Sequence, residues 1–462
     1  MHLGRLSRLL GSAVLTLTVG TAALAQDNAG APSQDLLDVW NKALARDPVY
    51  AASQAFEAAE QEAVPQARAQ LLPYVSADAV AQSDDTRRAS TFGNSSGGSS
   101  AEWALSLTQP IFDLGAWRGL EQAGYVARAG QVSTTHAYQN LILRVAQAYF
   151  DVLAAQDTLR ALLAEKQAIE TQLRAAERGF ELGSTTIADT YEAQSRLDIV
   201  TANEVRARNE LQNSTDRLAR IINERPGNLA ELATNIKLPS PAPSRLDDWT
   251  QQASAANLSV VLADLRARIA ESQIAIAKSR HYPTLDLQAQ TGTASDRGIY
   301  GPSSGPRSLD TAVGLRLSIP IFTGGEISSV VREQTSRLQQ ARYELENAKR
   351  EAVQLAQLYF AGVSSGLAQI RALAAAEKSS LASVQANKTG YEVGVRVNID
   401  VLNAQQQLYA TQRNLAQARY DTLMNSLRLK AATGTLSDND LHAVNKLLQT
   451  PSNRAAKPAA NP

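Results

Sequence analysis

Apolar side chains recur every seven residues along the second half of the chain. One row consists of Val331, Leu338, Leu345, Ala352 and Tyr359. A second row beside it consists of Ala341, Ala348, Leu355 and Gly362. Sustained spacing of seven is typical of helices that pack along their length, and two adjacent rows let one helix contact two neighbours. We therefore predict very long helices at about 111–180, 186–222, 326–391 and 398–432, arranged as an α-helical coiled-coil barrel.

Four shorter stretches, 74–82, 102–109, 284–291 and 311–319, alternate between apolar and polar residues. This period of two predicts strands with one apolar face, and about nine residues is the length of a strand that crosses a bilayer at a tilt. A half-buried sheet in a soluble protein would show the same alternation. The fold class predicted from the two patterns is therefore mixed, with long helices and four β-strands in each chain.

Both kinds of segment occur twice, in the same order, about 210 residues apart. Pro73 in LLPYVSADA recurs as Pro283 in HYPTLDLQA, and Pro110 in TQPIFDLG recurs as Pro320 in SIPIFTGG. Further on, FELGSTTIAD matches YEVGVRVNID. A near-constant offset along the chain indicates an internal duplication. Each copy reads helix, strand, loop, strand, long helix, turn, helix, and the opening helices lie at about 48–70 and 257–278.

The four prolines are expected at the junctions between strands and helices. Pro73 and Pro283 open the first strand of each copy, while Pro110 and Pro320 close the second. Proline lacks an amide donor, so it is tolerated at the end of a strand or in the first turn of a helix. The stretches between paired strands, 83–100 and 292–310, are rich in Gly, Ser and Asp and are expected to be outward-facing loops.

The first 25 residues read as a secretory signal peptide. Arg5 and Arg8 precede a short apolar stretch, and Ala23 and Ala25 form a small–x–small cleavage site. A membrane-spanning helix needs about 20 apolar residues, and no later segment approaches that length without charges. The rest of the chain divides into a first repeat (26–222), a proline-rich linker (223–256), a second repeat (257–432) and a C-terminal segment with a disordered tail (433–462).

Composition excludes several classes of function. The chain has no cysteine, which excludes disulfides and thiolate chemistry, and its 45 basic and 45 acidic residues balance, so nothing recruits nucleic acid. His136, His281 and His442 are far apart and show no metal-ligand spacing. Two G-x-S-x-G strings lie in the loops, not at the strand-to-helix elbow that a hydrolase needs. We therefore expect no catalytic residue, no metal and no cofactor, and the protein is not predicted to be an enzyme.

Four strands cannot close a barrel, and open strand edges are prohibitive in lipid. Known bacterial barrels begin at about eight strands. A dimer would supply eight strands, but barrels of that size are filled by side chains. A trimer would supply twelve strands and leave a lumen, so a conduit favours three copies. Two other readings, a periplasmic adaptor with one helical hairpin and a soluble coiled-coil scaffold or enzyme, fit the duplication and the paired amphipathic strands less well.

The sequence resembles the TolC family of outer-membrane channels over nearly all of residues 35–447. The resemblance rests on the duplication, on SLTQPIFDLG, RLSIPIFTGG and LDIVTANEVRARNEL, and on YEVGVRVNIDVLNAQQQLYATQRNLAQARY and LRLKAATGTLSDNDL. It implies a homotrimer with a twelve-stranded barrel in outer-membrane lipid and a helical barrel in the periplasm, belted by an equatorial domain. It also implies a passive duct for multidrug efflux or type I protein secretion. Its periplasmic tip is closed until a periplasmic adaptor and an inner-membrane pump of RND, MFS or ABC type engage it.

The resemblance places the pore constriction and the tip turns. Asp400 and Asn403 match two aperture positions where the family has acidic residues one turn apart, so the asparagine halves the formal charge of the ring. Gly183 and Gly394 match the tip turns, which contact the adaptor. A tight helical hairpin needs a residue at positive φ, and glycine is the residue that supplies it without strain.

The resemblance also implies links that hold the tip closed. Tyr391 and Arg396 match the residues that bond to polar groups after the first turn, and Asp189 matches one of those groups. Ala188 stands where the family can have threonine, so one link is expected to be missing. A plainer interpretation is available for the acids, because Asp189 and Asp400 both fall in the first turn of a helix, where a carboxylate stabilises the helix dipole.

Overall fold

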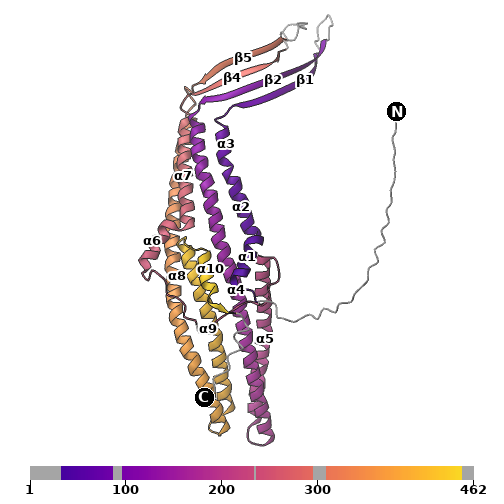
Figure 1. The fold of residues 1–462 in the computed structure, drawn as a ribbon, viewed down its shortest axis with the longest axis vertical. Helices are drawn as coiled ribbons and strands as arrows, with labels where there is room; N and C mark the ends of the chain where they lie inside the picture. Colours follow the sequence, from indigo (N-terminus) through magenta and orange to yellow (C-terminus); the bar gives the residue numbers. More distant parts are fainter. Residues whose placement is uncertain (1–32, 87–95, 234–235, 295–307, 450–462) are drawn as a thin grey trace, which may run out of the picture.

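A computed structural model describes residues 33–86, 96–233, 236–294 and 308–449. The expected signal peptide and the expected tail, residues 450–462, lie outside these ranges. The molecule is elongated, with a β-sheet at one end and long helices running away from it to two separate tips (Figure 1). Among the described helices, none combines the length and the apolar character needed to cross a membrane.

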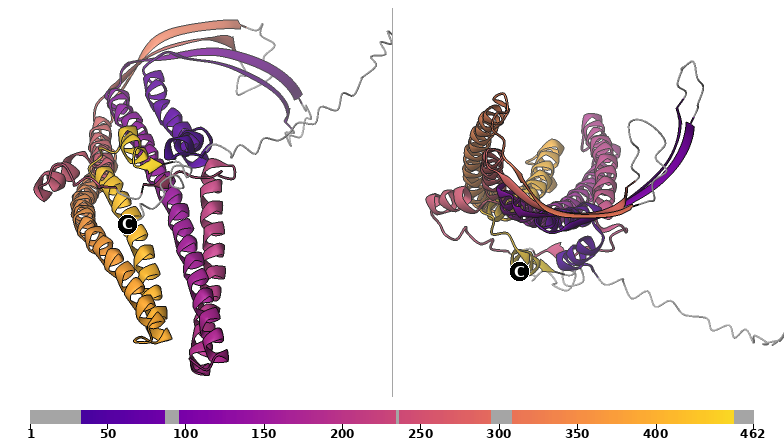
Figure 2. Two further views of the ribbon diagram at one scale, coloured as in Figure 1. Left: turned by 60° about the horizontal axis from the view of Figure 1, so that its bottom comes forward. Right: turned by 90° about the horizontal axis from the view of Figure 1, so that it is seen from above.

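The long helices are α4 (Leu114–Glu181), α5 (Ile187–Ile222), α8 (Glu326–Glu392) and α9 (Asn398–Ala432). The predicted bounds of all four helices agree with these to within three residues. α4 has 68 residues, which at 1.5 Å per residue makes it about 100 Å long. α4 packs along α5 and α8 packs along α9, so each repeat contributes one helical hairpin. The two hairpins lie side by side and extend away from the same end of the sheet (Figure 2).

Shorter helices surround this frame. They are α1 (Leu36–Arg46), α2 (Pro48–Gln61), α3 (Ala63–Ala69), α6 (Leu246–Ala256), α7 (Leu258–Ser279) and α10 (Asp438–Asn445). The helix predicted at 48–70 is divided at Glu62, because Pro65 lacks the amide that would bond to the carbonyl of Gln61. α6 lies in the stretch expected to be a linker, and its Trp249 is buried against Ala352 and Ala356 of α8.

The described part of the large sheet has the antiparallel order β1 (Tyr74–Thr86), β2 (Ser96–Phe112), β4 (Thr284–Ala294), β5 (Ser308–Ser318). The β2–β4 pair joins the two repeats. Val75, Leu107, Ala289 and Val313 pair in one line across all four strands, and the next line is mostly polar, with Ser76, Ser106, Gln290 and Ala312. One face of the sheet is therefore apolar and the other polar, as the alternation predicts.

The strands are longer than predicted. β1 and β2 have 13 and 17 residues, so both ends of the expected loop 83–100 are strand. Pro110 does not end β2; it pairs with Asp286, and after a shift in register Phe112 still pairs with Leu285. β2 continues past the proline because β4 lies beside it and supplies backbone partners. A second, two-stranded sheet, β3 (Glu231–Leu232) with β6 (Leu448–Gln449), was not predicted.

The main hydrophobic core lies midway along the molecule. There α1 and α10 pack against the long helices α4, α5 and α9, and the fully buried side chains include Leu36, Tyr149, Phe150, Leu218, Leu427 and Leu441. The Tyr149 hydroxyl donates a hydrogen bond of 2.8 Å to the carbonyl of Ala230. This core lies beside β3 and β6 and holds together the halves of the hairpins that are nearer the large sheet. The tips lie beyond it and are stabilised by other contacts.

Asp47 is a charged anchor of this region. It is 3% exposed, accepts two hydrogen bonds from Arg144 (2.9 and 3.2 Å), and caps α2 by accepting from the amide of Tyr50. Burial alone would raise the pKa of Asp47, but the hydrogen bonds from Arg144 and the Tyr50 amide, with the Arg144 charge, hold that pKa below its usual range.

Asp47→Asn is expected to lower stability at neutral pH. The cost is about 2 kcal/mol, less than for a fully buried pair, because Arg144 is 37% exposed. A carboxyl with a depressed folded-state pKa contributes stability above its unfolded pKa of about 3.9 and loses it as pH falls further. Thermal unfolding of both proteins at pH 7 and pH 3 tests this. The gap in melting temperature should shrink at pH 3, and a gap that stays constant would contradict the ionic origin.

Candidate functional site: the helical tips

The two tips are built on the same backbone turn. Gly183 after α4 and Gly394 after α8 have φ of 72° and 77°. In the first tip the amide of Gly183 donates to Phe180 O (2.9 Å) and that of Ser184 to Gly179 O (2.8 Å). The second tip repeats the pattern from Gly394 and Val395. A residue at positive φ with these paired bonds ends a helix sharply, so both predicted tip glycines lie where such a turn requires them.

A second glycine in each tip was missed by the sequence reasoning. A Cβ on Gly179 would lie 2.8 Å from Thr185, and one on Gly390 would lie 2.6 Å from Arg396 Cγ. Each turn therefore closes tightly over the glycine four residues before the positive-φ glycine. The repeat itself carried the signal, because GFELG and GYEVG align at the same offset as the rest of the second halves.

Asp189 lies in the first turn of α5 and is engaged there. Its carboxylate accepts from the Thr186 amide (3.0 Å) and hydroxyl (2.7 Å), and the Thr186 side chain accepts from the Asp189 amide. This is a capping box. The backbone carbonyl of Asp189 accepts a 3.1 Å bond from the side chain of Asn398, which is 1% exposed at the start of α9. Asn398 thus joins the two hairpins of one chain.

Arg396 and Asp400 lie together in the second tip. The Arg396 guanidinium is 3.6 Å from the Asp400 carboxylate, one helical turn on. Tyr391 is half-buried nearby, and burial, followed by the negative charge of Asp189, raises its pKa. The predicted closed-state residues are therefore gathered within one small region, but Asp189 is engaged with Thr186 and Arg396 with Asp400.

Asn403, the second predicted aperture residue, is exposed and bonds to the other hairpin. Its amide oxygen accepts a 2.9 Å hydrogen bond from Arg196 of α5, and the same guanidinium donates a 2.6 Å bond to Gln406. This contact could not be predicted from the sequence, because no motif or spacing relates α5 to α9. Beneath these polar groups, Leu173 of α4, Ala193 of α5 and Leu402 of α9 form a small buried cluster.

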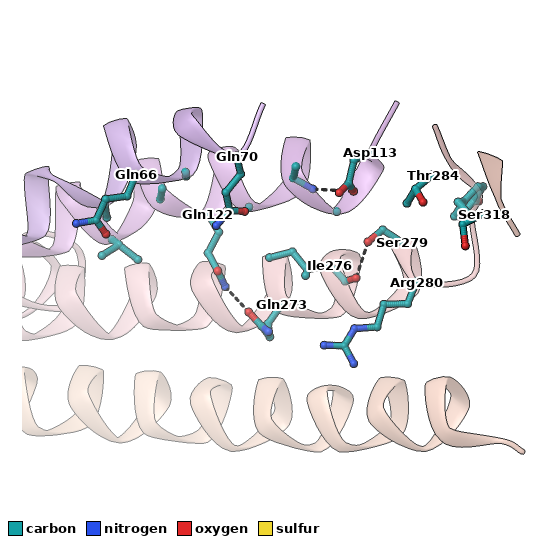
Figure 3. Close-up of a pocket in the computed structure, with 18 of the residues that line it drawn as sticks. Gln66, Gln70, Asp113, Gln122, Gln273, Ile276, Ser279, Arg280, Thr284 and Ser318 are labelled. Carbon is teal, nitrogen blue, oxygen red and sulfur yellow. Dashed lines mark hydrogen bonds between the residues drawn. The ribbon is translucent and has the colours of Figure 1, made fainter. Parts of the chain in front are cut away.

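The prolines lie at the other end of the helices, where they meet the sheet. Pro73 and Pro283 directly precede β1 and β4, Pro110 lies within the last three residues of β2, and Pro320 lies two residues beyond β5. Between α3, α4 and α7 the junction forms an open recess of about 760 Å³ (Figure 3). Its polar lining includes Gln66, Gln70, Gln122, Gln273, Thr284 and Ser318. Gln122 donates to Gln273 across it (2.7 Å), and Asp113 caps α4 by accepting from the Ala116 amide.

Nothing in the described residues resembles a reaction centre. No group of three or more His, Asp or Glu side chains there could hold a metal ion. The second G-x-S-x-G string lies outside the described ranges, and the first lies partly outside them. The features that remain are an amphipathic sheet, two long hairpins and two narrow tips.

A sheet with one apolar face, continued by long helical hairpins, is typical of one class of protein: outer-membrane channels in which long helices extend away from the membrane. The family model "Outer membrane efflux protein" matches residues 39–224 and 249–435, one segment on each predicted repeat. The chain belongs to this family. It is an outer-membrane efflux and secretion channel, not an enzyme, as the sequence predicted.

Relatives of known role support this assignment. The chain is 36% identical over 429 residues to outer membrane protein TolC of Escherichia coli strain K12, covering 91% of this chain and 86% of the relative. It is 31% identical over 419 residues to the alkaline protease secretion protein AprF of Pseudomonas aeruginosa, covering 88% and 86%.

Solved structures show the same fold. The Campylobacter jejuni outer membrane channel CmeC superposes with a TM-score of 0.74 at 16% identity, covering 91% of this chain and 90% of that one. VceC of Vibrio cholerae superposes with a TM-score of 0.72 at 20% identity, covering 86% and 96%.

Proposed function

We propose that this protein is a homotrimeric exit duct, passive in itself and opened at its periplasmic tip by an adaptor and an inner-membrane pump. The observation that carries the proposal is the pair of free sheet edges. β1 and β5 each pair on one side within the described sheet, and the apolar face of both strands is exposed, as at Val75 and Leu315. Unpaired backbone groups cannot face lipid, so the edges must meet those of other copies.

The internal duplication specifies how the edges would meet. In the chain, Leu107 at the end of the first repeat pairs with Ala289 at the start of the second. The equivalent of Leu107 in the second repeat is Leu317, 210 residues later, and the equivalent of Ala289 in the first repeat is Ala79, 210 residues earlier. The same pairing between copies therefore places Leu317 of one copy opposite Ala79 of the next. The same operation on the pair Phe112–Leu285 places Phe322 opposite Val75 of the neighbouring copy.

The ends of the two equivalent strands differ in the way that this pairing requires. β2 has a neighbour within the chain and runs to Phe112, whereas β5 ends at Ser318. The residues that would continue β5, Ile321 and Phe322, are 94% and 88% exposed. A neighbouring β1 would supply the partner that β5 lacks. Three copies then give a twelve-stranded barrel, with the polar face inward and the apolar face toward lipid.

Cysteine crosslinking tests this trimer, in a chain that has no cysteine of its own. Leu317→Cys combined with Ala79→Cys should form covalent dimers and trimers on oxidation. Leu317→Cys with Val75→Cys is the matched control, four residues out of register, and should crosslink poorly. Light scattering in detergent, with the detergent mass subtracted, should give three chains per particle. A monomer or a dimer, or equal crosslinking of both pairs, would contradict the proposal.

The tips are the proposed point of contact with the adaptor. Leu182 and Val395, next to Gly183 and Gly394, are large apolar side chains that remain exposed. Exposed apolar groups clustered at two equivalent turns suit a protein partner. The three copies would also bring Asp400 and Asn403 of each chain around one axis as the constriction, with Asp189, Tyr391 and Arg396 contributing its closed-state links. The family relationship to AprF supports polypeptides as one class of cargo.

A further inference from the structure

Arg196 forms a polar bridge between the two hairpins close to the tips. It lies on α5 of the first hairpin and donates to Gln406 Oε1 (2.6 Å) and Asn403 Oδ1 (2.9 Å) on α9 of the second. Both acceptors are exposed side chains, one turn apart on the same face of α9. A planar guanidinium that donates to two acceptors at once is held in a better-defined position than one that makes a single hydrogen bond.

We propose that Arg196 is a gating residue, which holds the second hairpin against the first in the closed tip and adds positive charge beside the constriction. The inference rests on the proposed role of the tip as the periplasmic constriction. It assigns to Arg196 a link that neither the sequence motifs nor the family resemblance indicates.

The strength of the neighbouring contacts indicates where the hairpins would separate. Further from the tip, Arg413 of α9 bonds to Glu165 of α4 at 2.9 Å, and the Glu165 side chain is only 5% exposed. Above that, the Tyr420 hydroxyl donates to Asp157 of α4 at 2.7 Å. Pairs shielded from water are costly to break, whereas exposed hydrogen bonds exchange readily with water. α9 is therefore anchored at Arg413. Nearer the tip, opening must break both the buried bond from Asn398 to the Asp189 carbonyl and the exposed contact with Arg196.

The chemistry of the acceptors determines the charge at the tip. The two groups that Arg196 contacts are neutral amides, so its positive charge is balanced by neither of them. Asp400, the acidic residue of the constriction, is already 3.6 Å from Arg396. Positive charge close to a narrow aqueous passage disfavours cations and attracts anions. Arg196 is thus expected to weaken the cation preference that Asp400 alone would give.

The test is a double-mutant cycle on single channels in planar lipid bilayers. Arg196→Gln should raise the open fraction about three- to tenfold, the range expected for one or two exposed hydrogen bonds, and should shift the reversal potential toward greater cation preference. Asn403→Asp should lower the open fraction in the wild-type background, because it turns the neutral contact into an ion pair. In the Arg196→Gln background, Asn403→Asp should leave the open fraction unchanged.

The control is Arg217→Gln, since Arg217 also lies on α5 but its bonds to described residues are to Glu210 and Ser214 of its own helix. It should change neither the open fraction nor the reversal potential. If Asn403→Asp has the same effect on opening with and without Arg196, the two residues are not coupled and the inference is wrong.

A reference variant separates this inference from the proposed function. Tyr391→Phe with Arg396→Ser alters other groups of the same tip. If this variant raises the open fraction but Arg196→Gln does not, the tip is the constriction and Arg196 is not part of its gate. If neither variant changes the open fraction while light scattering still shows trimers, the tip is not the constriction and the proposed gating fails with it.

Discussion

Replacing Gly292 by valine is expected to prevent assembly of the channel. A Cβ at this position would lie 2.4 Å from the backbone oxygen of Trp103 and 2.9 Å from Ala104 Cα. Both contacts are with backbone of β2, which cannot rotate away as a side chain can. The substitution should therefore cost about 3 kcal/mol, and it acts on the β2–β4 pair that joins the two repeats.

The measurement is the yield of trimers in outer-membrane extracts and the rate of channel insertion into bilayers. Gln290→Val is the matched control, because Gln290 lies two residues earlier on the same face of β4 and already carries a Cβ. The control should assemble as the parent protein does. Normal trimer yield from Gly292→Val would show that β2 and β4 can separate locally without loss of the sheet.

Replacing Asp400 by alanine is expected to remove block of the channel by divalent and trivalent cations. In the proposed trimer, three Asp400 carboxylates would surround one narrow aqueous passage and concentrate cations there. Each carboxylate contributes about 1 kcal/mol to a nearby cation even at the dielectric constant of water. Loss of all three should weaken the block about tenfold or more, although the Arg396 cation 3.6 Å away already offsets part of the charge.

Conductance with multivalent ions on the periplasmic side measures this effect. Block of the parent channel should itself fade at high salt, because the screening length is about 3 Å at 1 M. Asp216→Ala, on α5 and away from the tip, serves as the control. If Asp400→Ala leaves block unchanged but lowers the melting temperature, Asp400 acts only on the α9 helix dipole, a contribution of about 0.3–1 kcal/mol.

The long elements of the fold follow from periodicity. Spacing of seven over many turns identifies α8 and α9, and spacing of two identifies the strands, because in each case many residues repeat the same signal. The short helices α1, α6 and α10 were not predicted. Each has about three turns or fewer, and each is stabilised mainly by packing, as when Trp249 of α6 inserts against α8. For α6, which has no side-chain cap, such contacts between distant segments leave little local signal. α1 and α10 do carry local signals that were overlooked, because a capping box opens each helix, at Asp35–Asp38 and Ser437–Asp440.

In the candidate site, the two tip turns could be predicted from the sequence, but the hydrogen bonds between the two hairpins could not. Gly183 and Gly394 were predictable because a tight helical end has one strict requirement, a residue at positive φ. Arg196 was not, because its role depends on which face of α5 meets α9, and that follows from packing of whole hairpins. The extension of β2 through Pro110 was missed for a similar reason, since proline ends a strand only where no partner compensates.

If the free edges of β1 and β5 pair between chains as proposed, the stability of this protein would also depend on its concentration. A sheet whose last hydrogen bonds form only between chains cannot reach its lowest free energy alone, so dilution would favour unfinished molecules. A pair of chains in the proposed assembly still leaves two edges open, and only the ring of three leaves none. Until the third chain arrives, each exposed edge can template aggregation with any other strand. A newly exported chain would therefore benefit from being held apart from its neighbours before the ring closes.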